Sequence, residues 1–130
     1  SLDDIEHRIM RPIWRDPRVH YVVNCASIGC PNLKTTAWRP VTLEADLEGA
    51  ARDFVNHPRG VTVRPNGRVV VSSIYRWFRD DFGDSDAGVL AHLLRYAGPR
   101  LAAALRARNR IDGDDYDWSI NAWPSAIAPA

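Results

Sequence analysis

A β-hairpin signal in the middle of the chain constrains the fold more than any other feature. Two runs rich in β-branched residues, 61–64 and 68–71, flank the tripeptide Pro65-Asn66-Gly67. An Asn-Gly pair between two such runs favours a tight hairpin turn, because both residues tolerate the positive φ that the turn needs. The sequence therefore predicts two adjacent antiparallel strands here.

Helical patterns follow and precede the hairpin. Residues 43–56 carry apolar side chains at helical spacing, which is typical of an amphipathic helix. Residues 74–82 show a shorter helical pattern. Residues 88–108 are predicted to form a long helical stretch that is broken or bent at Gly98-Pro99.

Another helix is predicted at the start of the chain. Ser1 followed by Asp4 resembles a capping box, and apolar residues then recur at helical spacing. The residue before a proline disfavours the helical conformation. We therefore expect this first helix to end at Arg11-Pro12.

Two further strands complete the predicted order of elements. Residues 19–24 form an apolar run that is typical of a buried strand, and residues 114–121 are predicted as a last strand. Strands and helices in this order favour an α+β fold with a mostly antiparallel sheet, in which several helices pack on the hairpin. The whole chain, residues 1–130, is predicted to be a single domain.

Length and composition exclude several classes of function. A hydrophobic fraction of 45% with 25% charged residues is typical of a globular protein. The formal net charge of +1 provides no field that would attract nucleic acid. No apolar run approaches the roughly 20 residues of a membrane-spanning helix. We therefore expect no nucleic-acid partner and no membrane span, and a small molecule or a peptide as the substrate.

Both cysteines of the chain lie in one short segment after the predicted strand. The segment begins at His20, ends at Pro31 and reads HYVVNCASIGCP. A strand-to-turn junction can hold a reactive side chain out of a sheet, and cysteine with histidine is the minimum set for a thiolate nucleophile and its base. Backbone N–H groups in the turn could stabilise an oxyanion. We predict that Cys25 is the nucleophile of a hydrolase or acyl transferase that acts on an amide or thioester.

Two histidines are candidates for the general base. His7 follows Glu6 on the first predicted helix, whereas His20 lies five residues before Cys25. In a regular strand an odd offset places two side chains on opposite faces, so His7 is preferred and His20 is second. Glu6 belongs to the same candidate catalytic set. A third, orienting carboxylate could come from Asp3, Asp4 or Asp117.

Four blocks of sequence span most of the chain. They read SLDDIEH at residues 1–7, DPRVH through NCASIGCP at 16–31, VSSIYRWFRDDF at 71–82 and YDWSIN at 116–121. Together they resemble the family called domain of unknown function 547. This resemblance implies an α+β domain that is usually preceded by an aromatic-rich N-terminal portion. We therefore expect that portion to be missing here and to contact the domain where it is present.

The resemblance also implies further positions of interest. The matching blocks contain a set of candidate binding residues, namely Ser27, Cys30, Asp117, Trp118 and Asn121. A histidine that precedes the cysteine is similar to the order found in circularly permuted papain-like hydrolases. A permuted papain-like arrangement is therefore a further expectation, by analogy of arrangement only.

Two other functions remain open beside the enzyme. The domain could be a non-catalytic binding or interaction module with structural cysteines, because a cysteine beside a strand is often a small core residue. A zinc site could use His20, Cys25 and Cys30 with a fourth ligand, but four intervening residues are at the edge of normal ligand spacing. The predicted site therefore includes no metal ligand and no cofactor.

The two cysteines could also be bonded to each other. A gap of four residues between Cys25 and Cys30 permits a disulfide. Disulfides persist in oxidising compartments, so this pair favours a periplasmic or secreted protein over a cytoplasmic one.

Overall fold

The hairpin predicted from Asn66-Gly67 is confirmed. In the computed structural model, which describes residues 1–122, strand β1 (Val61–Val63) runs antiparallel to β2 (Val69–Ser72). Gly67 lies in the turn with a φ of +79°, a conformation that glycine adopts without steric cost.

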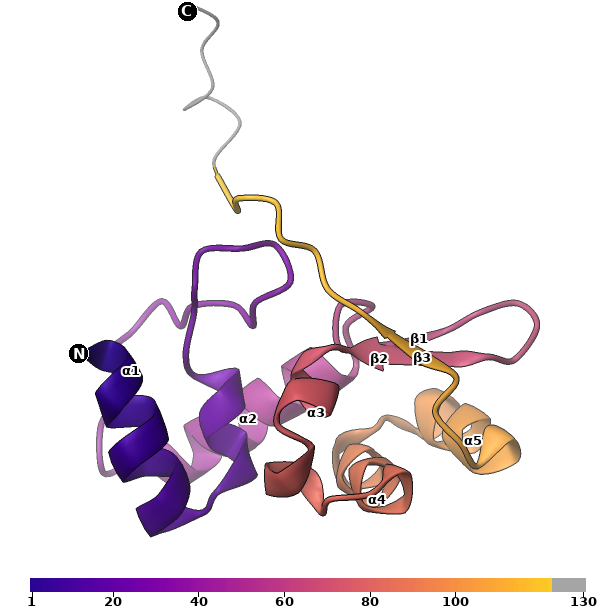
Figure 1. Cartoon of the computed structure of the whole chain (residues 1–130), viewed down its shortest axis with the longest axis horizontal. Helices are drawn as coiled ribbons and strands as arrows, with labels where there is room; N and C mark the ends of the chain where they lie inside the picture. The colour runs from indigo at the N-terminus through magenta and orange to yellow at the C-terminus, as the bar shows by residue number, and fades with distance from the viewer. Residues whose placement is uncertain (123–130) are drawn as a thin grey trace, which may run out of the picture.

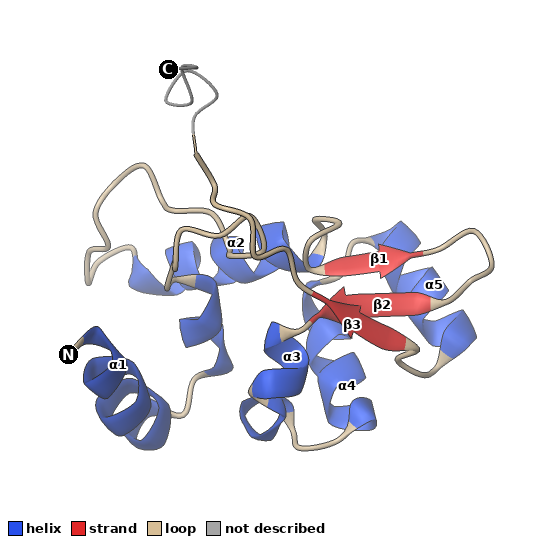
Figure 2. Ribbon diagram, turned by 45° about the horizontal axis from the view of Figure 1, so that its top comes forward, coloured by secondary structure: helices blue, strands red, loops and turns tan. Residues whose placement is uncertain are grey.

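A third strand, β3 (Gly113–Asp115), completes the sheet on the other edge of β2. Val71 of β2 lies opposite Val61 on one side and opposite Asp114 on the other. The β2–β3 pair is parallel, because the chain crosses over through several helices before it returns. The sheet is therefore mixed, as Figure 2 shows. The α+β class is confirmed, and a mostly antiparallel sheet is not.

The helices predicted from apolar spacing are present, and their boundaries differ slightly from the predicted ones. α2 (Leu43–Val55) matches the prediction except for its last residue. α4 (Asp86–Tyr96) and α5 (Pro99–Arg108) replace the single bent stretch, because Gly98 separates them and Pro99 takes the first helical position. Both helices lie below the sheet in Figure 1.

The helix predicted over residues 74–82 is divided in two. α3 (Ile74–Trp77) is followed by the 3₁₀ helix η3 (Arg79–Phe82). The break falls at Phe78, whose ψ of 34° departs from helical values. Gly83 ends the second piece with a φ of +99°, as expected for a glycine at a helix C-terminus.

The first helix does not end at Pro12, contrary to the prediction. α1 (Leu2–Asp4) continues directly into η1 (Ile5–Trp14), whose turns are wider than those of an α-helix. In an α-helix the proline ring would clash with the carbonyl of Arg8, and a wider turn moves this carbonyl away. The helix ends at Arg15, which has a φ of +52°.

The strand predicted over residues 19–24 is not present. Residues Pro17–Tyr21 form the 3₁₀ helix η2, and Asp16 caps it by accepting a hydrogen bond from the N–H of Arg18 at 3.0 Å. An aspartate cap followed by proline starts a helix, and this local signal outweighs the apolar run that follows. Residues 19–21 are buried all the same.

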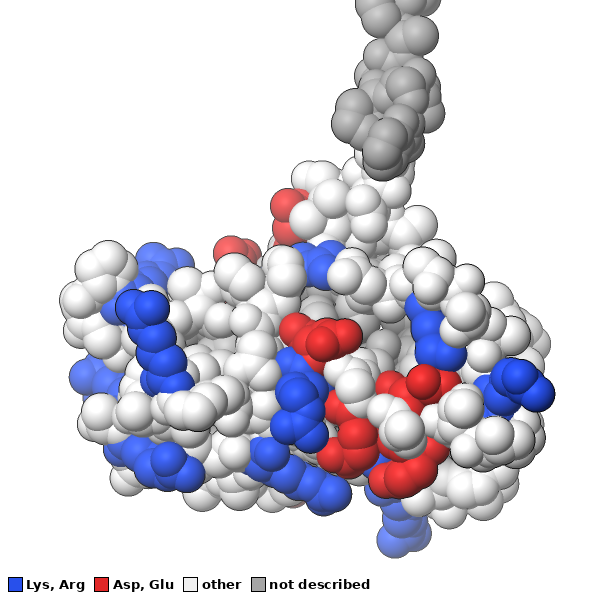
Figure 3. Space-filling view, turned by 180° about the vertical axis from the view of Figure 1, so that it is seen from behind, with Lys and Arg blue, Asp and Glu red and all other residues white. Residues whose placement is uncertain are grey.

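Arg18 holds η2 against α2. Its guanidinium contacts the carboxylates of Asp16, Glu44 and Glu48 at 2.7, 2.6 and 2.8 Å. Acidic and basic side chains also lie next to one another on the face of the molecule shown in Figure 3. Arg18 thereby fixes the point from which the cysteine segment departs.

The hydrophobic core lies between the sheet and the helices. It includes Tyr21, Phe54, Val69, Tyr75 and Leu93, which are at most 3% exposed. The hydroxyl of Tyr21 lies 3.0 Å from the hydroxyl of Tyr75 and 2.6 Å from Nε2 of His92. These contacts join η2 to α3 and α4, so the chain after Tyr21 begins from a fixed position.

The helix formed by α1 and η1 carries an exposed apolar stripe. Leu2, Ile5, Ile9 and Ile13 are 85%, 47%, 41% and 65% exposed. Their spacing of three or four residues places them on one face of the helix. Between residues 1 and 122, no helix combines the length and the apolar character that crossing a membrane requires.

Candidate functional site at the Cys25–Cys30 disulfide

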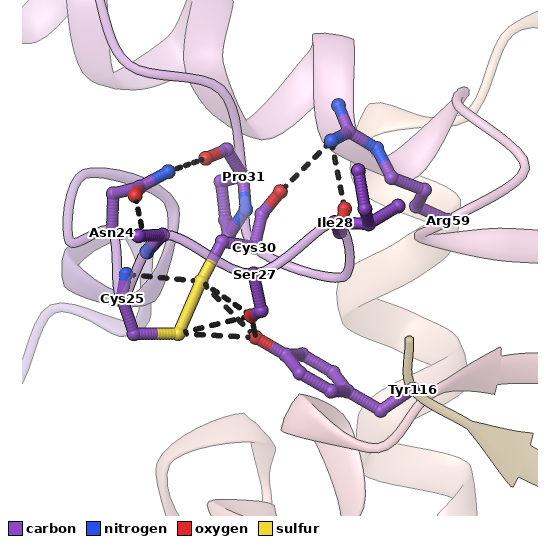
Figure 4. The surroundings of a disulfide bond; sticks show 9 residues. Asn24, Cys25, Ser27, Ile28, Cys30, Pro31, Arg59 and Tyr116 are labelled. Atoms are coloured by element: carbon purple, nitrogen blue, oxygen red, sulfur yellow. Dashed lines mark hydrogen bonds between the residues drawn. A yellow bond between two sulfur atoms is a disulfide. The ribbon is translucent and has the colours of Figure 1, made fainter. Parts of the chain in front are cut away.

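Cys25 and Cys30 form a disulfide that closes a short loop, drawn in Figure 4. Asn24 holds both ends of the loop. Its side-chain amide donates to the carbonyl of Pro31 at 2.8 Å, and its Oδ1 accepts from the N–H of Ala26 at 2.7 Å. Ala26 has a φ of +64°, in a region that costs a residue with a Cβ about 1 kcal/mol. The hydrogen bonds of Asn24 thus keep the loop in one shape.

The two cysteines differ in their exposure to solvent. Cys25 is an exposed residue, whereas Cys30 is only 4% exposed. Thiol–disulfide exchange depends on access to the sulfur that is attacked. An incoming thiolate therefore reaches Sγ of Cys25 more readily than Sγ of Cys30.

Three hydrogen-bond donors surround the sulfur of Cys30. The backbone N–H of Cys25 lies 3.0 Å from this sulfur, the hydroxyl of Tyr116 3.1 Å and the hydroxyl of Ser27 3.3 Å. The same hydroxyls of Tyr116 and Ser27 lie 3.3 and 3.2 Å from Sγ of Cys25, and 2.7 Å from each other. Each hydroxyl has one hydrogen, so the two donate at most two hydrogen bonds to sulfur at one time.

Tyr116 reaches the disulfide because the chain after β3 pairs with the cysteine loop. The carbonyls of Asp117 and Ser119 accept hydrogen bonds from the N–H groups of Gly29 and Ile28, both at 2.8 Å. A Cβ at Gly29 would lie 2.8 to 2.9 Å from atoms of the Tyr116 ring, too close for a real side chain. Glycine at this position therefore lets the ring lie against the loop.

The last strand, predicted over residues 114–121, is only partly present. Regular pairing stops at Asp115, and the rest of the segment makes one isolated antiparallel bridge, between Ile120 and Ser27. Asn121 donates its N–H to the carbonyl of the residue before Ser27 at 2.8 Å. Of the predicted binding residues, Ser27 and Asn121 thus lie on two segments that the fold brings together.

Arg59 belongs to this site and was not predicted from the sequence. Its guanidinium donates to the carbonyls of Ile28 and Cys30 at 3.0 and 3.1 Å, and to Oδ1 of Asn32 at 2.7 Å. A guanidinium can satisfy several acceptors at once, because it carries five N–H donors. No motif around Arg59 signals this role, since two of its acceptors are backbone carbonyls of a distant segment.

The predicted base His20 lies in a second cluster, which contacts neither sulfur. Its Nε2 lies 2.7 Å from Oδ2 of Asp81, and its Nδ1 lies 3.9 Å from Oε1 of Glu6. The ring is 1% exposed and stacks on Phe78 at 4.3 Å between centroids. Burial lowers the pKa of His20, and the carboxylate of Asp81 opposes this shift.

His7 belongs to the same cluster. Its Nδ1 lies 3.2 Å from the guanidinium of Arg11, and its Nε2 lies 3.4 Å from Asp3. Over residues 1–122 no hydrogen bond joins either histidine to a cysteine. The structure therefore groups Glu6 with the histidines and does not bring them to Cys25. The catalytic roles of these four residues stay predictions.

Trp118 and Asp117 follow Tyr116 in the same extended segment. The Trp118 side chain is 69% exposed, and its ring lies 4.7 Å from the ring of Tyr116 and 5.4 Å from that of Trp77. Hydrogen bonds from Ser119 lower the pKa of Asp117, whose Oδ1 accepts the N–H of Ser119 at 2.8 Å. Asp117 thus shapes the backbone turn beside the site.

The zinc set predicted as an alternative is not assembled. His20 is bonded to Asp81, and the sulfurs of Cys25 and Cys30 are bonded to each other. In the described part of the chain, no three histidine, cysteine or carboxylate side chains gather in the manner of a metal site.

A cleft with a volume of about 680 Å³ lies between α2 and the chain after Pro31. Its lining includes Lys34, Trp38, Asp53 and Arg59. Neither cysteine lines this cleft, but Arg59 and Pro31, which both contact the disulfide loop, do.

The model of a family described as "Protein of unknown function, DUF547" matches residues 1–55. The predicted resemblance to this family is therefore confirmed over these residues, which are 55 of the chain's 130. The match includes both cysteines and ends at the last residue of α2. No curated protein and no solved structure matches the chain. The permuted papain-like arrangement thus stays a prediction.

Proposed function

We propose that this protein is a thiol–disulfide exchange protein whose reactive bond joins Cys25 to Cys30. The observation that carries the proposal is the asymmetry of the two sulfurs. Cys25 is exposed, whereas Cys30 is 4% exposed, and its sulfur accepts a backbone N–H in addition to facing the two hydroxyls that both sulfurs share. An accessible sulfur to attack and a stabilised sulfur to leave are what the exchange reaction requires.

The reaction starts with a thiolate of the substrate, which attacks Sγ of Cys25. A mixed disulfide forms between the substrate and Cys25, the bond to Cys30 breaks, and its electron pair stays on the Cys30 sulfur. A second thiolate of the substrate then attacks the first substrate sulfur and releases Cys25 as a thiolate. The substrate dithiol is oxidised to a disulfide, and the protein disulfide is reduced to a dithiol by the same two electrons.

The donors around Cys30 support this direction of bond breaking. A thiolate is a better hydrogen-bond acceptor than a disulfide sulfur, because it carries a full negative charge. The N–H of Cys25 and the hydroxyls of Ser27 and Tyr116 already lie within 3.3 Å of the sulfur that would acquire this charge. They therefore stabilise the leaving thiolate without a rearrangement of the loop.

The hydrolase or acyl transferase predicted from the sequence would use the same residue, Cys25, but as a nucleophile in its reduced form. Reduction of the disulfide would free Cys25, with Ser27 and Tyr116 as its polar neighbours in place of a histidine. A small-molecule thioester such as acetylthiocholine, offered to the reduced protein and to a Cys25→Ala variant, tests this second activity. Hydrolysis that depends on Cys25 would support the hydrolase activity as a function of the reduced protein.

The exchange reaction is tested on the folded protein in dithiothreitol buffers of graded potential. Thiols are trapped by iodoacetamide and counted by mass spectrometry. We expect the disulfide to open without unfolding, at a potential above about −300 mV, which is the upper range of structural disulfides. A Cys30→Ser variant should retain a small thiol as a mixed disulfide on Cys25.

A disulfide that opens only when the chain unfolds, or only below that potential, would contradict the proposal. The cysteines would then be structural, as in the alternative of a non-catalytic binding module. Circular dichroism of the reduced protein provides the control, because it shows whether the fold persists when the bond is open.

A further inference from the structure

An aromatic cluster lies beside the disulfide, and its two exposed indoles have no role in the exchange step itself. It consists of Trp77 in α3 with Tyr116 and Trp118 in the segment after β3. The three ring centroids lie 4.7 to 5.4 Å from one another. Trp77 is 46% exposed and Trp118 is 69% exposed. Aromatic rings gathered at a surface are typical of binding sites, because their apolar area gains from being covered.

The cluster and the disulfide share one side chain. The hydroxyl of Tyr116 contacts the sulfurs of both cysteines, while the ring of Tyr116 contacts Trp77 and Trp118. A single tyrosine ring therefore separates the exposed indole of Trp118 from the sulfur of Cys25. Tyr116 and Trp118 are two residues apart and both contact Trp77, so their side chains lie on the same side of the extended segment.

The backbone holds this arrangement in place before any partner binds. The carbonyls on both sides of Trp118 accept hydrogen bonds from Gly29 and Ile28, at 2.8 Å each. Gly29 also lets the Tyr116 ring lie against the cysteine loop. A surface that is already ordered loses little conformational entropy when a ligand covers it.

We infer that the aromatic cluster binds the polypeptide that carries the reacting thiol, so that the preferred substrate is a cysteine in an extended segment with apolar neighbours. In an extended chain, side chains two residues apart lie on one face about 7 Å from each other. A cysteine bonded to Cys25 would thus bring an apolar neighbour at that spacing over Trp118. A small thiol reaches the sulfur without covering the indole. This inference rests on the proposed exchange reaction and names its substrate class.

Two pentapeptides and dithiothreitol test the inference. Each peptide has one central cysteine flanked by serines, and the terminal residues are both leucine in one peptide and both glycine in the other. The second-order rate of mixed-disulfide formation on the oxidised protein is measured by mass spectrometry. We expect the leucine peptide to react about tenfold faster than the glycine peptide, the factor that burial of one apolar side chain can supply.

Two tryptophan variants complete the experiment. Trp118→Ala should lower the rate of the leucine peptide about tenfold and leave the rates of the glycine peptide and dithiothreitol unchanged. Trp14→Ala is the matched control, because Trp14 is 67% exposed and lies on η1, away from the cluster. It should change none of the three rates.

Equal rates for the two peptides on the unchanged protein would overturn the inference and leave the exchange reaction standing. If Trp118→Ala reacted more slowly with dithiothreitol and with both peptides, the inference would also be overturned. The indole would then act by positioning Tyr116 and not by binding substrate. A disulfide that none of the three reagents opens would contradict the exchange reaction, and the inference with it.

Discussion

Nε2 of His20 lies 2.7 Å from Oδ2 of Asp81, although 61 residues separate the two along the chain. The same carboxylate accepts a hydrogen bond from Arg11 at 2.6 Å. Asp81 of η3 is therefore bonded to one residue of η1 and one of η2. Burial raises the pKa of Asp81, but the hydrogen bonds from Arg11 and His20 together outweigh burial and leave this pKa below its usual value.

Asp81→Asn should destabilise the fold by about 2 kcal/mol, because it removes the carboxylate that both the Arg11 guanidinium and the buried His20 ring contact. Urea unfolding at pH 7 measures the change. Asp80→Asn is the control, since Asp80 is 69% exposed and lies 3.4 Å from Arg11. An exposed ion pair of this kind should contribute less than about 0.5 kcal/mol. Equal losses in the two variants would contradict the role of Asp81.

His92 should make the fold sensitive to mild acid. Burial lowers the pKa of His92 to about 4 from 6.5, so the folded state disfavours the charged ring. The stability that this group contributes is complete above pH 6.5 and is lost as the pH falls toward 4. His92→Gln should remove about 2 kcal/mol of the acid-induced loss. The free energy of unfolding in urea, measured from pH 7 to pH 4, checks this. His57→Gln, at an exposed position, should leave the free energy of unfolding as dependent on pH as it is in the unchanged protein.

Loss of the disulfide should lower the free energy of unfolding by about 2 kcal/mol, because the bond closes a short loop and restricts the unfolded chain. A variant with Cys25→Ser and Cys30→Ser is compared with the oxidised protein by urea unfolding. Adding dithiothreitol should bring the unchanged protein close to the variant and leave the variant unaffected. A response of the variant to the reductant would show that the effect does not come from this bond.

Tyr116→Phe should make the disulfide harder to reduce. The reduced state loses a donor to the Cys30 thiolate, so the reduction potential should fall by about 30 mV. Equilibration with dithiothreitol buffers measures the potential. Tyr96→Phe is the matched control, since its hydroxyl donates to Glu48 at 3.2 Å and contacts no sulfur. A shift of the same size in the control would exclude a specific effect of Tyr116.

Gly29→Ala should destabilise the fold by about 2 kcal/mol, because the added Cβ would meet the Tyr116 ring at 2.8 Å and push it from the loop. Thermal unfolding measures the change. Gly49→Ala should have the opposite effect on stability, because a Cβ at Gly49 meets nothing within 4 Å and the residue lies inside α2. That change should stabilise the helix by about 0.5 to 1 kcal/mol. Similar behaviour of the two variants would contradict the close packing of Tyr116.

Local signals in the sequence predict the elements that they determine alone. Asn66-Gly67 fixes the hairpin, and apolar spacing alone locates α2. Where two local signals compete, the sequence does not predict the element: in the apolar run after Asp16-Pro17, the cap and the proline favour η2 over a strand. A list of apolar residues does not reveal which of these signals is the stronger.

Only part of the candidate site could be predicted, because some of its residues are far apart along the chain. The cysteines share one segment and can be recognised from their spacing. Tyr116 and Arg59 lie 86 and 29 residues from Cys30, and only the folded chain brings them to it. The predicted pairing of Cys25 with His7 rested on the order of residue types along the chain, which does not determine distance in space.

The bridge between Ser27 and Ile120 has a consequence for how the protein is made. In a chain synthesised from its N-terminus, both thiols emerge well before the segment that contains Tyr116. Until that segment docks, the newly made thiols have neither the tyrosine hydroxyl nor the indole surface beside them. Their behaviour during synthesis is therefore that of ordinary cysteines. A fragment limited to residues 1–55, the part that the family model matches, would contain both cysteines but neither Arg59 nor Tyr116.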